Sequence, residues 1–176
     1  MDQLADDAVE LFSQLILTKA FPAGFRRVRE HRRLGHRTVL ITGALDIVVE
    51  RNLAPLFDDI VCARMSRTPD GRHWSGELTD APPTGEARAM AMADYAAAEG
   101  LDLAEAVAYA DSASDLPMLE AVGFPVAVNP ETRLSAIARK RGWLVETWER
   151  APGGPRALLP IGTATRASSF RRTVPT

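Results

Sequence analysis

The chain has 176 residues and a formal net charge of -2, with 46% hydrophobic and 25% charged residues, which suits one globular domain with a sizeable core. This charge gives no electrostatic reason to expect nucleic acid or an anionic membrane surface as a partner. No apolar run reaches the ~18 residues of a membrane-spanning helix, and the acidic, amphipathic start is unlike a signal peptide, so a cytoplasmic protein is expected.

The first part of the chain alternates helical and strand-like patterns. Apolar residues at helical spacing predict helices, whereas short β-branched runs bounded by Gly predict buried parallel strands. The expected elements are helices over residues 3–17, 24–33 (ending at Gly35) and 44–52, and strands over residues 38–41 and 59–63. Between residues 64 and 79, loose alternation around Pro69-Asp70-Gly71 predicts a β-hairpin.

The second part continues this alternation. It predicts helices over residues 84–99, 116–121 and 131–141, strands over residues 106–110 and 126–128, and an edge strand over residues 143–145. Strands that alternate with helices favour a parallel sheet in an α/β sandwich. Beyond Ala151 the sequence is rich in Pro, Gly, Ser and Thr, and we expect a largely disordered tail.

Two candidate sites lie where open α/β sheets place their ligands, next to strand ends and helix starts. The first is Thr42-Gly43, in what we expect to be a strand-to-helix turn, where a hydroxyl and backbone N–H groups can hold a phosphate oxygen. The second is Arg88, at the start of the next long helix, which can offset phosphate charge. Each has a plain alternative, because Thr often caps helices and Arg often lies on a solvated helix face.

The third candidate is a pair of carboxylates. Asp111 and Asp115 flank a tight Ser/Ala loop directly after an apolar strand. Mg²⁺ prefers one or two carboxylates together with waters and substrate phosphate as ligands. The alternative is a helix cap, because Asp115 precedes Pro117 in an expected first turn.

Taken in this order, the three features resemble motifs II, III and IV of the haloacid dehalogenase (HAD) superfamily, in its phosphoserine-phosphatase-like branch. The most specific match is Asp-Ser-x-x-Asp-Leu-Pro-Met-Leu at residues 111–119, and the whole resemblance covers roughly residues 35–148. It implies a HAD-like Rossmannoid three-layer α/β sandwich with a parallel sheet and a β-hairpin. The implied organisation is a remnant of a helical cap (1–34), the core (35–150) and the tail (151–176).

The resemblance also implies a function for each candidate residue. Thr42 with Gly43 would bind the transferred phosphoryl group, and Arg88, in a position usually filled by Lys, would stabilise its charge. Asp111 would ligate Mg²⁺, and Asp115 would orient the metal's waters or the basic residue as part of the metal site. The implied activity is a Mg²⁺-dependent phosphatase acting on a small phosphorylated metabolite such as phosphoserine.

One motif of the family is not found in this sequence. HAD enzymes use two aspartates in an Asp-x-Asp-x-Thr motif at the end of the first strand, and no such motif occurs in these 176 residues. In the family that strand lies between the strands of motifs II and IV, so we expect a gap with unpaired backbone groups there. The simplest interpretation is a truncated chain, inactive alone, whose Met1 lies inside a longer reading frame and which an upstream segment of the full-length chain completes.

Two other readings stay open at this point. The chain is a non-catalytic HAD-like binding or interaction module, if no nucleophile motif precedes it. Alternatively, it is an unrelated α/β binding domain in which the Asp-Ser-x-x-Asp run arose by chance. An Asp-x-Asp-x-Thr motif in the upstream sequence would exclude the first reading. No response of the extended chain to Mg²⁺ would favour the second.

Overall fold

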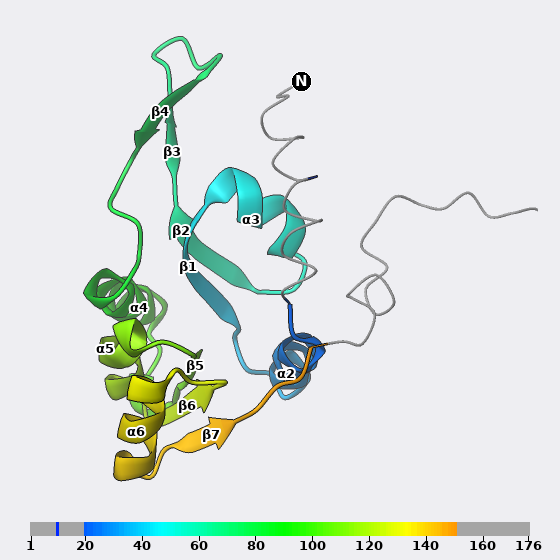
Figure 1. The fold of residues 1–176 in the computed structure, drawn as a ribbon. Helices are drawn as coiled ribbons and strands as arrows, with labels where there is room; N and C mark the ends of the chain where they lie inside the picture. Colours follow the sequence, from blue (N-terminus) through cyan, green and yellow to red (C-terminus); the bar gives the residue numbers. More distant parts are fainter. Residues whose placement is uncertain (1–9, 11–19, 151–176) are drawn as a thin grey trace, which may run out of the picture.

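A computed structural model describes residue 10 and residues 20–150 as an arrangement of helices around short sheets (Figure 1). The helices are α2 (Pro22–Arg33), α3 (Asp46–Leu53), α4 (Glu86–Glu99), α5 (Leu116–Glu120) and α6 (Thr132–Arg141), with 3₁₀ turns η1 (Leu103–Glu105) and η2 (Ala113–Asp115). The strands are β1 (Val39–Leu45), β2 (Asp59–Ala63), β3 (Met65–Arg67), β4 (Trp74–Leu78), β5 (Val107–Ala110), β6 (Phe124–Val128) and β7 (Leu144–Glu146).

The strands form two separate parallel sheets and one hairpin. β1 pairs in parallel with β2, and β5, β6 and β7 form a second parallel sheet with β6 in the middle. β3 and β4 pair antiparallel and project from the body of the molecule (Figure 1). Within residues 20–150, β1 and β5 therefore each pair on one side only, which matches the expected break between the strands of motifs II and IV.

The buried core lies on one face of the β5–β6–β7 sheet, under α4, α5 and α6. Leu119 and Leu134 are fully buried there, and Ala127 of β6 is 0% exposed. The cluster comprises Met92, Ala108, Met118, Leu119, Val122, Ala127, Leu134 and Ala138. Ile41 of β1 also packs against it, so the helical layer reaches both sheets from the same side.

Helix α2 contacts the opposite face of the β5–β6–β7 sheet. Tyr109 follows Ala108 in β5 and so points away from the core cluster, and its hydroxyl lies 2.8 Å from Nε2 of His31. Arg27 donates to Glu146 of β7 at 2.7 Å. Because Arg32 also pairs with Asp58 before β2 at 3.2 Å, α2 connects the two sheets.

Most of the expected elements are confirmed. β2 spans the predicted residues, β3 and β4 form the predicted hairpin, and Gly100 ends α4 in a left-handed conformation. Parallel sheets with helices on both faces give the expected mixed α/β fold class. The helix expected over residues 3–17 and the expected tail lie outside the described residues, and the domain boundaries stay a prediction.

Several expected boundaries differ from the structure by about two residues, as at the starts of α3, α4 and β6, and two of the differences have a clear physical reason. The second helix begins at Pro22 and not near Gly24, because Pro has the right φ for the first turn and needs no N–H partner there. β1 continues to Leu45, so Thr42 and Gly43 lie within a strand and not in a strand-to-helix turn. Pairing with β2 extends the strand, since Leu45 still pairs with Ala63 across an irregularity after Thr42.

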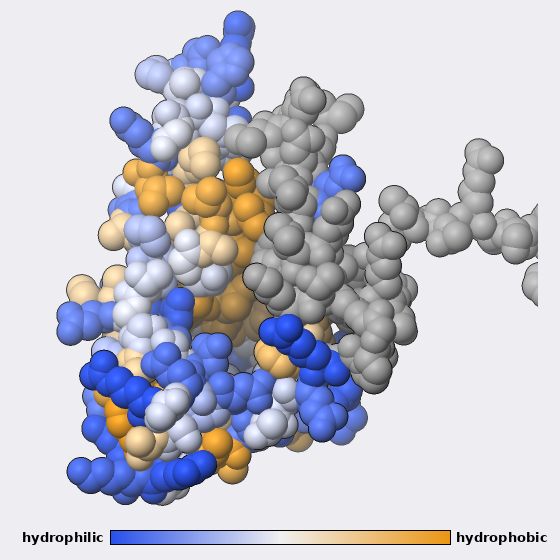
Figure 2. Space-filling model, in the orientation of Figure 1, coloured by the Kyte–Doolittle hydropathy of each residue, from blue (hydrophilic) through white to orange (hydrophobic). Residues whose placement is uncertain are grey.

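The two sheets differ in how well their side chains are covered. No residue of β1 is buried, and apolar side chains gather over β1 and β2 on the face drawn in Figure 2. No helix in the described part of the chain is long and apolar enough to span a membrane.

Candidate functional site

The three candidate segments meet where β1 and β5 end and α4 begins. A Cβ added to Gly43 would lie 2.7 Å from the side-chain methyl group of Thr84, so the loop before α4 packs directly on the end of β1. Gly85 approaches the carbonyl oxygen of Ser114, at 3.7 Å from an added Cβ. The structure therefore brings together segments that lie far apart in the sequence.

Gly43 has a steric reason to be glycine. A Cβ at this position would lie too close to the Thr84 methyl group, so that side chain or the loop that carries it would have to shift. Next to it, the hydroxyl oxygen of Thr42 accepts a hydrogen bond from the backbone N–H of Ala44 at 3.2 Å. This bond orients the Thr42 hydroxyl at the irregular part of β1.

Arg88 and Asp115 form an ion pair at the centre of this region. Arg88 lies in the first turn of α4 and also donates through Nε to the carbonyl oxygen of Pro83 at 3.2 Å. The side chain of Asp115 is 6% exposed, and this burial raises its pKa. The nearby Asp111 carboxylate raises the pKa further, whereas Arg88 lowers it. A second cation or a proton near Asp111 and Asp115 would relieve this repulsion.

Asp111 differs from Asp115 in its surroundings. It is exposed, directly after β5, and its carboxylate has no hydrogen bond or ion pair within residues 20–150. The loop that follows is closed by short-range bonds, because Ser112 accepts from the N–H groups of Ser114 (3.2 Å) and Asp115 (3.1 Å). Asp111 is therefore an available ligand on an ordered loop.

The donor set fits a hard divalent cation only in part. Carboxylate oxygen is the ligand type that Mg²⁺ prefers, and one or two carboxylates suffice when water and phosphate complete the shell. Asp111 offers such an oxygen, whereas Asp115 is engaged by Arg88. The described residues contain no group of three or more His, Cys, Asp or Glu side chains that could hold a metal ion.

Glu131 is a contact of this loop that the sequence did not reveal. Its carboxylate accepts a hydrogen bond from the N–H of Ala113 at 2.8 Å, and its own N–H donates to the carbonyl oxygen of Asp111 at 2.9 Å. The sequence predicts a helix start at Glu131 but carries no signal for a bond between residues 18 positions apart. The only available hint is an acidic residue just after β6, a neighbour of β5.

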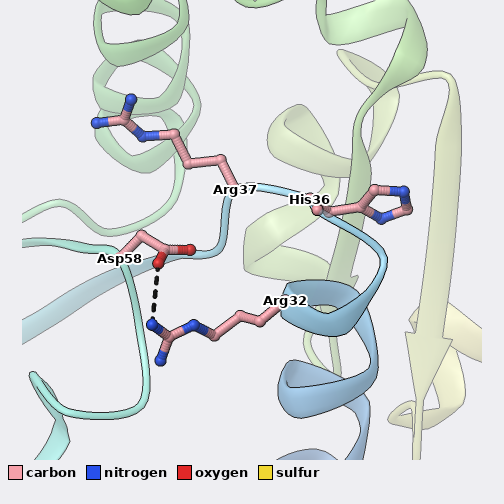
Figure 3. A pocket seen from close by; sticks show the side chains of 5 residues that line it. Arg32, His36, Arg37 and Asp58 are labelled. Atoms are coloured by element: carbon pink, nitrogen blue, oxygen red, sulfur yellow. Dashed lines mark ion pairs between the residues drawn. The ribbon is translucent and has the colours of Figure 1, made fainter.

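A second polar cluster lies at the other end of β1. A cavity of about 440 Å³ is lined by Arg32, Gly35, His36, Arg37 and Asp58. Arg32 pairs with Asp58, and His36 points away from the other labelled side chains (Figure 3). Its charges already compensate one another, because Arg37 pairs with Asp59 at 2.8 Å, and it lies at the amino end of the strand. Sites of open α/β sheets lie at the carboxyl end instead.

Comparison with known proteins agrees with the motifs. A family model described as haloacid dehalogenase-like hydrolase matches residues 2–120. Phosphoserine phosphatase SerB1 of Mycobacterium tuberculosis is 30% identical over 162 residues, which cover 90% of this chain and 51% of that protein. The protein named inhibition of morphological differentiation protein, from Streptomyces azureus, is 34% identical over 152 residues, covering 85% of this chain and 54% of its own length.

A solved structure has a similar fold. A protein of unknown function from Bordetella pertussis Tohama I is 28% identical to this chain, with a TM-score of 0.73. The match covers 82% of this chain and 66% of that one. This chain spans about half the length of each of these two curated relatives.

Proposed function

Because this chain belongs to the haloacid dehalogenase-like hydrolase family, we propose that its full-length form is a Mg²⁺-dependent phosphatase for a small phosphorylated metabolite. The observation that carries the proposal is the meeting of Thr42-Gly43, Arg88 and the Asp111–Asp115 loop at one end of the sheets. Phosphoserine is the first substrate to test, because the relative from M. tuberculosis is named for it. Nucleic acid and membranes are not proposed as partners.

Each residue is proposed to act on the phosphate or on the groups around it. The Thr42 hydroxyl and the backbone N–H groups beside Gly43 bind phosphoryl oxygens. Arg88, which pairs with Asp115, offsets the charge that grows on the phosphoryl group during transfer. Asp111 would hold Mg²⁺, which when bound stabilises that charge as a Lewis acid. The Asp115 carboxylate keeps Arg88 in place.

The nucleophile is proposed to come from a segment outside these 176 residues. That segment pairs as a strand between β1 and β5. In the described part of the chain, each of these two strands has one edge with no hydrogen-bonded neighbouring strand. Its first Asp attacks phosphorus, and the alcohol leaves with a proton from its second Asp. Water then attacks phosphorus, with its proton taken by the second Asp, and inorganic phosphate and the free carboxylate result. This chain alone is expected to be inactive.

The test uses the full-length protein and an aryl phosphate such as p-nitrophenyl phosphate. We expect Mg²⁺-dependent hydrolysis that Asp111→Asn lowers by at least about 100-fold, because removing the charged ligand removes metal and charge stabilisation together. Glu105→Gln, at the opposite end of β5, is the matched control and should keep parental activity. Unchanged turnover in Asp111→Asn would remove the assignment of the metal site.

A non-catalytic phosphate-binding module is the second candidate. It is motivated by the lack of an Asp-x-Asp-x-Thr motif in the 176 residues. An in-frame motif of this type after an apolar strand in the upstream sequence would exclude it. If no such motif precedes the chain, binding of inorganic phosphate without turnover is the expected behaviour.

A further inference from the structure

We infer that Glu131 is a positioning residue that holds the Asp111–Asp115 loop in the shape required to bind a divalent cation. The inference rests on the proposed metal site. It assigns part of the affinity for the divalent cation to a residue that is proposed to touch neither metal nor phosphate. The geometry behind it is a two-point hydrogen-bonded clamp across Ser112.

The clamp fixes the peptide groups on both sides of Ser112. The N–H of Glu131 donates to the carbonyl oxygen of Asp111, and its carboxylate accepts from the N–H of Ala113. One residue therefore satisfies an acceptor and a donor of an exposed loop that otherwise closes on itself. A carboxylate acceptor makes the second bond charge-assisted, which is stronger than a neutral one.

The two ends of the loop are held by different elements. Arg88 from α4 pairs with Asp115 at one end, and at the other end the backbone N–H of Glu131 bonds the Asp111 carbonyl while the Glu131 carboxylate accepts from the N–H of Ala113. The direction of Asp111 from the end of β5 depends on the peptide that Glu131 fixes. Without this clamp, Asp111 samples more orientations, and ordering them on metal binding costs free energy.

Glu131 is itself held by a rigid turn. Asn129 has a φ of 43°, a left-handed conformation that Asn tolerates better than most residues, and its N–H donates to the carbonyl oxygen of Glu146 at 2.9 Å. The Asn129 side chain also bonds the backbone N–H (2.8 Å) and carbonyl (3.0 Å) of Trp148. The turn after β6 is thus anchored to the segment after β7, which gives Glu131 a fixed base.

The experiment measures Mn²⁺ binding to the full-length protein, in which the upstream segment completes the proposed site, by the loss of the free-ion paramagnetic resonance signal. Three variants are compared with the parent, namely Glu131→Ala, Glu131→Gln and the exposed control Glu105→Ala. Glu131→Ala loses the acceptor for Ala113 and should weaken Mn²⁺ binding by about tenfold, the scale typical of residues that orient metal ligands. Glu131→Gln keeps an acceptor oxygen and should stay within about threefold of the parent, and the control should not change.

Exchange of the Ala113 amide hydrogen, followed by NMR, reports the clamp independently of metal. It should accelerate in Glu131→Ala while amides of β6 keep their protection. Equal Mn²⁺ affinity in Glu131→Ala and the parent would overturn the inference, and so would equal losses in the Ala and Gln variants, which would make charge alone responsible. Absence of Mn²⁺ binding in the parent would overturn the proposed metal site itself, and this inference with it.

Discussion

The β5–β6–β7 sheet and the β1–β2 sheet are built from similarly apolar strands but are covered very differently. The core cluster of the first includes Leu119 and Leu134, which are fully buried, whereas every residue of β1 is only half-buried. Apolar side chains over β1 and β2 remain visible at the surface in Figure 2. Hydrophobic sequence alone therefore does not decide burial, because a strand also needs neighbours on its edges and faces.

The two halves are joined by two helices on opposite faces. α4 packs near the core cluster and reaches β2 through the Tyr95 hydroxyl, which donates to Asp59 at 2.6 Å. This bond and burial raise the pKa of Tyr95 to about 12, with burial the larger cause. On the other face, α2 reaches both sheets through His31 and Arg32. The β1–β2 half therefore depends on polar contacts for much of its attachment.

The same substitution placed in each half tests this contrast. Leu134→Ala removes a fully buried side chain of α6 and should lower the free energy of unfolding by about 2–5 kcal/mol. Leu40→Ala in the half-buried β1 should cost less than about 1.5 kcal/mol, since less area is removed from contact with the core. Urea titrations followed by circular dichroism measure both.

One result for these two variants would contradict the expectation. Equal costs would mean that β1 is as well covered as the core in solution, and that the contrast between the sheets is wrong. Slower amide exchange in β6 than in β1 would independently support the expected order. Ala127 of β6 and Leu40 of β1 are suitable probes, because each lies in a paired part of its strand.

Local signals allowed much of the fold to be predicted. α4 was predicted from helix-forming residues and from Gly100, whose φ of +66° ends the helix, and β2 from a short apolar run. The extension of β1 through Gly43 was not predictable, because it depends on parallel pairing with β2. The separation into two sheets was predicted only through the family resemblance, which indicated that a strand belongs between them.

The candidate site, too, was predictable from the sequence only in part. The position of Thr42, Arg88 and Asp111 at or just after the ends of predicted strands predicted a shared site, and the structure brings their segments together. The Glu131 clamp and the His31 contact to Tyr109 were not predictable, since they join residues 18 and 78 positions apart. Such contacts follow from strand order, which local sequence does not specify.

The Arg88–Asp115 pair offers a smaller perturbation within the well-packed half. Arg88→Met removes the cation that pairs with the carboxylate of Asp115, a residue that is only 4% exposed. The expected loss is about 1–3 kcal/mol of unfolding free energy at neutral pH, because a buried group loses its partner. The double variant Arg88→Met/Asp115→Asn should recover more than half of this loss in urea titrations.

The pH dependence of this loss has a defined sign. Burial raises the pKa of Asp115, and removing Arg88 takes away the contact that lowers it. A carboxyl group whose pKa is raised by folding stabilises the native state when protonated, and this contribution is lost as pH rises through the folded pKa. Arg88→Met and the parent should therefore converge below about pH 4. A deficit that does not change with pH would show that packing, and not charge, sets the cost.

The smallest expected effect lies in the β1–β2 half, at Asp58. The backbone N–H and the hydroxyl of Thr38 both donate to its carboxylate, at 2.8 Å each, and these bonds lower the pKa of Asp58. A lowered pKa gives stability that is present above about pH 4 and is lost as pH falls through the folded pKa. Because the Asp58 side chain is 33% exposed, its contribution should stay near 1 kcal/mol or below.

Asp58→Asn keeps an acceptor oxygen for Thr38 but no longer titrates, and it also removes the anion that pairs with Arg32, so it reports the charged contacts of Asp58 together. Thermal unfolding between about pH 3 and pH 7 should give a flatter profile for the variant than for the parent, with the difference confined to the acid side. Asp94→Asn, on the exposed surface of α4, is the matched control and should follow the parent. Identical profiles for Asp58→Asn and the parent would mean that neither the Thr38 bonds nor the Arg32 ion pair of Asp58 contributes to stability in solution, and the attachment of that half would then rest on α4.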